Sequence, residues 1–66
     1  MTFSEKLVGL RRKAGLSQEE LASRLEVSRQ AVSKWENGTS DPSTSNLIAL
    51  AKLFDLSAEE LLHEVR

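Results

Sequence analysis

The 66 residues of this chain leave room for one small domain, and a domain of this size buries only about 60% of the surface that its unfolded chain exposes. The chain has no cysteine and one histidine, His63, which excludes disulfides and the usual zinc sites, so we expect no metal ion, cofactor or small-molecule ligand. No apolar run reaches the roughly 18 residues of a membrane helix, and the N-terminus lacks the apolar core of a signal peptide, so we expect a cytoplasmic protein.

The net charge of −1 is unusual for a nucleic-acid binder, but the charges are unevenly distributed along the chain. Residues 1–40 contain seven basic and five acidic side chains, whereas residues 41–66 contain two basic and five acidic ones. The first half is therefore compatible with contact to a polyanion, although its charge alone does not demand one.

Helix caps and apolar spacing predict five helices and no strand, so we expect an all-α fold. The first helix is expected from Phe3 to Ala14, where Gly15 supplies the C-terminal stop. Ser17 opens the second helix, and Glu20 three residues later completes a capping box. The residues expected to face the core from these two helices are Phe3, Leu7, Leu10, Ala14, Leu21 and Leu25.

Three further helices show the same signals. Ser28 caps the third helix, which ends at Asn37-Gly38, and Ser43 caps the fourth. Ser57 with Glu60 forms a capping box that opens a short last helix. The apolar residues of the last two helices are Leu47, Leu50, Leu53, Phe54, Leu61, Leu62 and Val65.

Segment 21–32 aligns without gaps on segment 50–61, since both contain Leu-Ala, an acidic turn residue, an apolar residue and a serine cap. Both segments are therefore predicted to be helix–turn–helix corners. The first continues with Arg29-Gln30 and the second with Ala58-Glu59. Because carboxylates repel phosphates, only the first corner is suited to face DNA.

Hydrogen-bonding side chains gather on one side of the third helix. On a helical wheel, Ser28 and Trp35 share the side of Val32. The outward set consists of Arg29 on the flank and of Gln30, Ser33, Lys34 and Asn37. Such a helix fits the major groove of B-DNA, where glutamine can pair with adenine and arginine with guanine.

We predict that Arg29 and Gln30 read base edges, where a bidentate pair discriminates by about 1–3 kcal/mol, and we add Ser33 to this base-reading set. Lys34 reaches either a base edge or a phosphate, and we favour the base edge. Gln18 begins the second helix, where exposed amides favour a phosphate. The phosphate-contacting set also includes Ser28.

This pattern resembles the Cro/CI-type helix-turn-helix domain, or XRE family, of phage and bacterial repressors. The matching residues are Leu10-Arg11, 15–18, Leu21-Ala22, 27–30, 35–38, Pro42, Leu47, Ala51 and 56–62. The resemblance implies a five-helix, lambda-repressor-like DNA-binding domain over residues 1–66, with its helix-turn-helix unit at about 17–37. It also implies a nucleoid-associated protein of bacterial or phage origin, and such modules often head longer proteins.

The resemblance carries residue roles as well. The family's base-reading positions coincide with Arg29, Gln30 and Lys34, and its phosphate-contacting positions with Gln18 and Asn37. Arg11 and Glu36 match a pair that forms an internal salt bridge, so we expect both to be structural. Where the family usually has a turn glycine this chain has Glu26, and Asp55 stands at the equivalent point of the second corner. A side chain in the left-handed conformation costs roughly 1 kcal/mol.

Several residues also have simpler interpretations. Its spacing from Val32 places Trp35 in the core rather than against a base. The cluster Arg11 to Lys13 is interpreted as a solvated helix end in preference to a DNA clamp, and His63 as a surface residue. The acids of the last helix lack the paired environment of acid–base catalysis, so we expect no enzyme.

The sequence therefore predicts a sequence-specific, double-stranded DNA-binding transcriptional regulator, most simply a repressor that blocks polymerase sterically. Two copies are expected on a pseudo-palindromic operator, with centres about 34 Å apart. Leu62 and Val65 are candidates for the homodimer contact, although they could instead pack onto Val8. The alternative is an antitoxin-like protein–protein interaction module that uses the fold without reading DNA, which the acidic last helix favours slightly.

Overall fold

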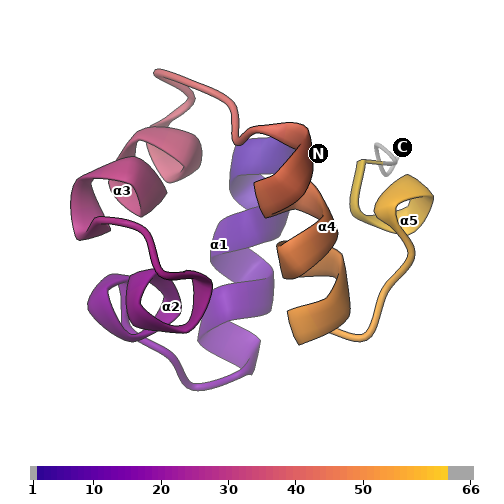
Figure 1. The fold of residues 1–66 in the computed structure, drawn as a ribbon, viewed down its shortest axis with the longest axis horizontal. Helices are drawn as coiled ribbons and strands as arrows, with labels where there is room; N and C mark the ends of the chain where they lie inside the picture. The colour runs from indigo at the N-terminus through magenta and orange to yellow at the C-terminus, as the bar shows by residue number, and fades with distance from the viewer. Residues whose placement is uncertain (1, 63–66) are drawn as a thin grey trace.

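The computed structural model describes residues 2–62, which form five α-helices and no strand (Figure 1), so the all-α prediction is confirmed. The helices are α1 (Phe3–Lys13), α2 (Gln18–Leu25), α3 (Arg29–Asn37), α4 (Thr44–Leu53) and α5 (Ala58–Leu62). His63 and Val65 lie outside the described residues, as does the side chain of Leu62, so the predicted dimer contact remains a prediction.

Hydroxyl side chains begin the helices at the predicted positions. The Ser17 hydroxyl accepts a hydrogen bond from the Glu20 amide at 3.0 Å, and the Glu20 carboxylate accepts one from the Ser17 amide at 2.9 Å. Ser28 and Ser43 cap α3 and α4, and Ser57 forms the second predicted capping box. Thr2, which the sequence analysis did not identify, caps α1 in the same way as Ser17 caps α2.

The capping boxes make the stability of the domain depend on pH in the acidic range. Hydrogen bonds from Ser17 hold the pKa of Glu20 below its usual value near 4.5, and hydrogen bonds from Thr2 do the same to the pKa of Glu5. Because the folded pKa lies below the unfolded one, this stabilisation is complete above the usual value and is lost as the pH falls through the folded value. We expect the thermal midpoint, followed by circular dichroism, to fall between about pH 5 and pH 3. The fall should be smaller in Glu20→Gln, which cannot titrate, and an equal fall in both proteins would contradict this role.

The two predicted corners share one geometry. Glu26 and Asp55 adopt the left-handed conformation, with φ of 58° and 56°. The next amides close the corners, Val27 on the Ala22 carbonyl at 3.0 Å and Leu56 on the Ala51 carbonyl at 2.7 Å. Both turn predictions are therefore confirmed.

Glu26, the left-handed residue between α2 and α3, has a strained backbone conformation that a glycine would relieve. We expect Glu26→Gly to raise the free energy of unfolding by about 1 kcal/mol, because glycine adopts φ of 58° without steric cost. The matched control is Gly38→Ala, where φ is 80°, and it should lower stability by a similar amount. Urea unfolding of both variants measures the effect, and a destabilised Glu26→Gly would show that the Glu26 side chain contributes more than its strain costs.

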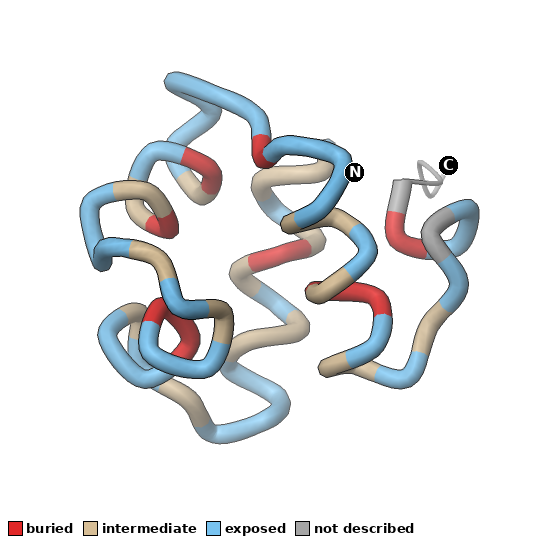
Figure 2. The backbone as a smooth tube through the Cα atoms, in the orientation of Figure 1, coloured by how far each residue is buried: buried red, intermediate tan, exposed pale blue. Residues whose placement is uncertain are grey.

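The first helix lies at the centre of the domain, with α2 and α3 on one side and α4 and α5 on the other (Figure 1). Buried positions face inward from every helix (Figure 2). The buried apolar residues of the helices are Leu7, Leu21, Ala22, Val32, Trp35, Leu50, Ala51 and Leu61, and Pro42 is buried in the segment between α3 and α4. Most other predicted core residues, such as Leu25 and Leu47, are half-buried and pack against this cluster.

One core prediction is wrong. Ala14 is exposed, and α1 ends one residue earlier than expected, at Lys13. The Ala14 amide still donates to the Leu10 carbonyl at 3.0 Å, so Ala14 lies on the Leu10 side of α1, but there it lines a surface hollow beside Phe54 instead of packing into the core.

Candidate nucleic-acid interface

One face of helix α3 packs against the rest of the domain, and the opposite face is exposed to solvent. Val32 is fully buried and Trp35 is 4% exposed, which confirms that the tryptophan belongs to the core. The helix packs against α2 and α1. On its outer side Arg29, Gln30 and Lys34 are exposed. Asn37 is exposed as well, whereas Ser33 is half-buried.

Ser28 differs from its place on the helical wheel. Helical periodicity predicts that Ser28 lies beside Val32, but Ser28 is exposed. Its φ of −76° and ψ of 153° are those of an N-cap, so helical periodicity does not apply to it. Its hydroxyl oxygen accepts from the Ala31 amide at 3.1 Å, which leaves the hydroxyl proton available to a ligand.

The outward side chains at the middle of α3 are chemically available. Within residues 2–62, the side chains of Gln30, Ser33 and Lys34 make no hydrogen bond to the protein, so their donors and acceptors can pair with a ligand. The first turn of α3 contains no acidic residue that would repel a polyanion.

The end of α3 presents hydrogen-bond donors. The side-chain oxygen of Asn37 accepts from the Thr39 amide at 2.9 Å and also from the Thr39 hydroxyl. This turn holds the Asn37 carbonyl against the chain and leaves its NH₂ group as the free end of the side chain. Thr39 was not among the predicted residues, although an asparagine followed by a hydroxyl residue two positions later is a known turn signal.

Gln18 links α2 to α3 through both ends of its amide. Its nitrogen donates to the Glu36 carboxylate at 3.0 Å, and its oxygen accepts from the Arg29 guanidinium at 3.5 Å. The side chain is thus engaged within the protein, a contact that the sequence analysis did not foresee. The first backbone amides of α2 have no intrahelical acceptor, so a phosphate contact there would use the backbone.

A largely buried ion pair joins α1 to the end of α3. Arg11 donates to the Glu36 carboxylate through Nε at 2.6 Å and through Nη2 at 3.1 Å, and it donates to the Leu16 carbonyl at 2.9 Å. The two side chains are only 12% and 6% exposed. The hydrogen-bonded Glu36 raises the pKa of Arg11, so the arginine remains charged. The pair that the resemblance implied is therefore present.

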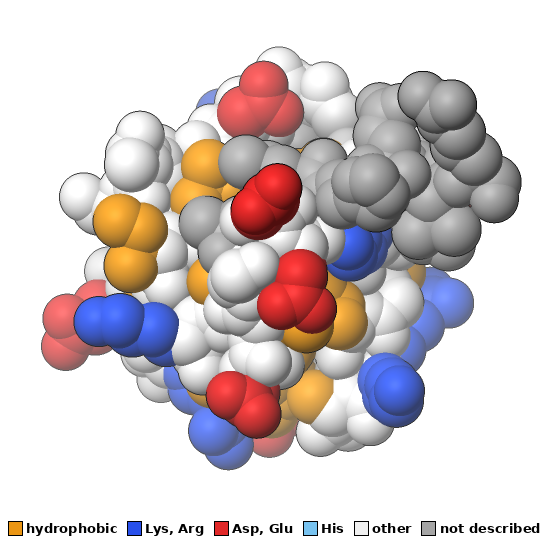
Figure 3. All heavy atoms as spheres, turned by 90° about the vertical axis from the view of Figure 1, so that its right-hand side faces the viewer, with side chains coloured by type: hydrophobic (Ala, Val, Ile, Leu, Met, Phe, Trp, Pro, Cys, Tyr) orange, Lys and Arg blue, Asp and Glu red, His pale blue; other side chains and the backbone are white. Residues whose placement is uncertain are grey.

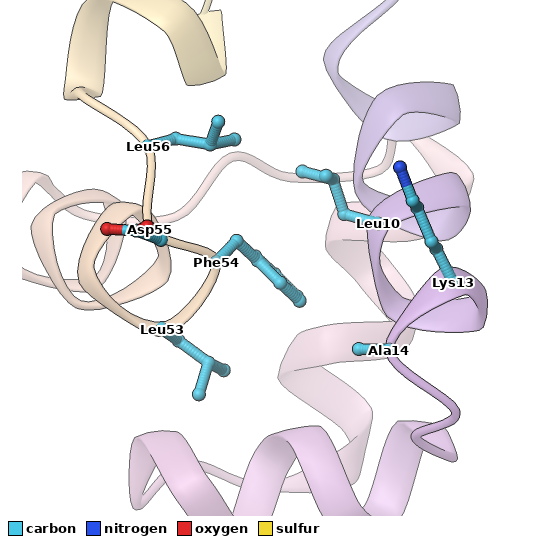
Figure 4. A pocket seen from close by; sticks show the side chains of 7 residues that line it. All are labelled: Leu10, Lys13, Ala14, Leu53, Phe54, Asp55 and Leu56. Atoms are coloured by element: carbon cyan, nitrogen blue, oxygen red, sulfur yellow. The ribbon is translucent and has the colours of Figure 1, made fainter.

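The opposite side of the domain has a different character. Figure 3 shows acidic side chains along the middle of the face that carries α5, with basic ones toward its edges. An apolar hollow lies between the end of α1 and the α4–α5 corner (Figure 4). Leu10 and Phe54 point into this hollow, and Lys13 and Asp55 are the charged residues among the described ones that line it. Across the described range, His, Cys, Asp and Glu form no cluster of three that could hold a metal ion.

Within residues 2–62, none of the helices is both long and apolar enough to cross a bilayer.

Residues 9–61 match the model of the helix-turn-helix family. The chain belongs to this family. The resemblance to Cro/CI-type domains and the lambda-repressor-like, five-helix fold are thereby confirmed.

Several members of the helix-turn-helix family are similar over nearly the whole chain. The HTH-type transcriptional activator BcrR of Enterococcus faecalis is 47% identical over 62 residues, which are 94% of this chain and 30% of BcrR. The HTH-type transcriptional regulator DicA of Escherichia coli K12 is 36% identical, over 94% of this chain and 46% of DicA. This chain therefore spans about a third to a half of these relatives.

A solved helix-turn-helix structure is similar in shape as well. The P22 c2 repressor, crystallised in complex with a synthetic operator, has a TM-score of 0.88 to this chain and 32% sequence identity. The similarity covers 94% of each chain.

Proposed function

We propose that residues 1–66 form a single domain of a transcriptional regulator that binds double-stranded DNA sequence-specifically, with α3 in the major groove. The observation that carries this proposal is the outer face of α3, where Arg29, Gln30 and Lys34 are exposed above a buried Val32 and Trp35. The likeness to the P22 c2 repressor, whose structure contains an operator, supports it.

The contacts divide into two sets. We propose that Arg29, Gln30, Ser33 and Lys34 read base edges, and that Ser28 and Asn37 contact phosphates through their side chains and Gln18 through its backbone amide. Gln30 is free to pair bidentately with adenine because the protein uses neither end of its amide. The free NH₂ group of Asn37 and the free hydroxyl proton of Ser28 are donors, as a phosphate requires.

A single α3 covers one half-site, which rarely gives enough specificity, so we propose that the protein acts as a homodimer on a pseudo-palindrome. Binding alone then represses any promoter that overlaps the site, without catalysis. The relatives include a named activator, and an activating role would follow from an operator placed beside the promoter instead of within it.

Selection from a randomised duplex library at moderate salt tests the proposal. We expect a two-fold symmetric motif whose half-sites lie about one helical turn apart. The affinity for the selected duplex should fall steeply with salt, because phosphate contacts release counterions. The absence of both enrichment and salt-sensitive binding would overturn the proposal.

The acidic face that carries α5 favours a second candidate, a protein–protein interaction module (Figure 3). That function predicts an intact fold and no measurable affinity for any duplex, so the same experiment separates the two.

A further inference from the structure

We infer that Glu36 is a positioning residue for base reading, and that it acts through Gln18 on the guanidinium of Arg29. This inference rests on the proposed function, because it concerns how Arg29 is held for its base. It gives the Glu36 carboxylate a role in specificity in addition to its role in the stabilising ion pair with Arg11.

The contacts form a continuous chain from the interior to the outer face of α3. One oxygen of the Glu36 carboxylate accepts both Arg11 Nη2 at 3.1 Å and the Gln18 amide nitrogen at 3.0 Å. The Gln18 oxygen then accepts from Arg29 Nη1 at 3.5 Å. Three helices contribute to this chain, with Arg11 on α1, Gln18 on α2, and Glu36 and Arg29 on α3.

Both neighbours of Gln18 enforce the same orientation of its amide. A carboxylate only accepts hydrogen bonds, so Glu36 requires the NH₂ end of Gln18. A guanidinium only donates, so Arg29 requires the oxygen end. Rotating the amide by 180° would place two acceptors together at Glu36 and two donors together at Arg29. Gln18 is therefore locked with its oxygen toward Arg29.

The fixed orientation of the Gln18 amide matters because Arg29 is exposed and has no other hydrogen-bond partner within residues 2–62. A free arginine loses rotamer entropy when it is fixed on a base. The Gln18 oxygen engages only Nη1, so the remaining donors of the guanidinium stay available to a guanine edge. The Arg29 side chain is therefore partly ordered before DNA binds.

The negative charge of Glu36 decides which way Gln18 turns. If Glu36 were a neutral amide, it could donate to Gln18 as well as accept from it, so it would no longer exclude the rotated orientation. The unneutralised Arg11 would then attract the Gln18 oxygen inward, and Arg29 would lose its acceptor. Glu36→Gln should therefore release the Arg29 side chain, although Glu36 does not contact Arg29.

The measurement is a ratio of affinities. The probes are the duplex that the wild-type domain selects from a random library and its single base-pair variants, and Arg29→Ala identifies the base pair that Arg29 reads. Partial unfolding weakens binding to every duplex by the same factor, so it cancels in the ratio. Discrimination at this base pair is thus a readout that a purely structural role would not change.

We expect Gln18→Leu and Glu36→Gln each to lower this discrimination by about fivefold, and to leave discrimination at the Gln30 base pair unchanged. The matched control is Arg11→Met, which breaks the same ion pair but keeps the Glu36 carboxylate on Gln18, so it should lower stability and preserve discrimination.

Three results would overturn the inference. Gln18→Leu or Glu36→Gln could weaken all duplexes equally, which would mean a phosphate contact or a structural role only. Arg11→Met could lower discrimination as much as Glu36→Gln does, which would mean that the ion pair and not the amide matters. A wild-type domain without any sequence preference would overturn the proposed function itself, and the inference with it.

Discussion

Arg29→Ala is expected to remove the preference for one base pair in each half-site while leaving the fold intact. Arg29 is exposed at the first turn of α3, and no core contact depends on it. A bidentate arginine–guanine pair is worth about 1–3 kcal/mol of discrimination, so the wild-type preference should fall by roughly one order of magnitude. The measurement compares affinities for the selected duplex and for its variants at that position, at one fixed salt concentration.

The control for this change is Arg24→Ala, which removes the same charge from an exposed position at the end of α2. It should weaken all duplexes by a similar, small factor and leave discrimination unchanged. If Arg29→Ala behaved like Arg24→Ala, Arg29 would be a phosphate contact, and the assignment of the first turn of α3 to base reading would be wrong.

Trp35→Ala is expected to unfold most of the domain at room temperature. Trp35 is 4% exposed and belongs to the core cluster that joins α3 to α1 and α2. Truncating a buried tryptophan costs about 3–5 kcal/mol, which is comparable to the whole stability of a domain of this size. Circular dichroism should show a large loss of helix at 25 °C together with a loss of DNA binding.

Trp35→Phe distinguishes this core role from base stacking. Phenylalanine fills part of the same space, so the variant should fold with a lower thermal midpoint and still bind the selected duplex. A Trp35→Ala variant that keeps the wild-type thermal midpoint but no longer binds DNA would contradict the core assignment, because a core residue cannot be truncated without a loss of stability.

Local chemistry explains why so much of the fold could be predicted from the sequence. A serine followed by glutamate three residues later satisfies amides within one turn of helix, so Ser17 and Ser57 identify helix starts without tertiary information. The acidic turn residues Glu26 and Asp55 were placed by the alignment of the two corners, and both adopt positive φ. The prediction for Ala14 failed because periodicity places it on the Leu10 side of α1 but does not show that this end of the helix borders a surface hollow instead of another helix.

The site was less predictable, because its geometry depends on contacts between distant residues. Surface positions on α3 followed from periodicity, and Arg11–Glu36 followed from the family resemblance. The contacts of Gln18 had no local signal, since Glu36 is 18 residues away and Arg29 is 11 residues away. Periodicity predicts which side chains point outward, but it does not predict which of them are held by a neighbour.

Backbone amide shifts in ¹H–¹⁵N nuclear magnetic resonance spectra, recorded while the selected duplex is added, test the central claim most directly. The outer face of α3 and the start of α2 should contact DNA, so the largest shifts are predicted in residues 17–19 and 28–39. A scrambled duplex should give smaller shifts at the tip of α3. Shifts confined to α5 and the end of α1, with α3 unchanged, would contradict the account.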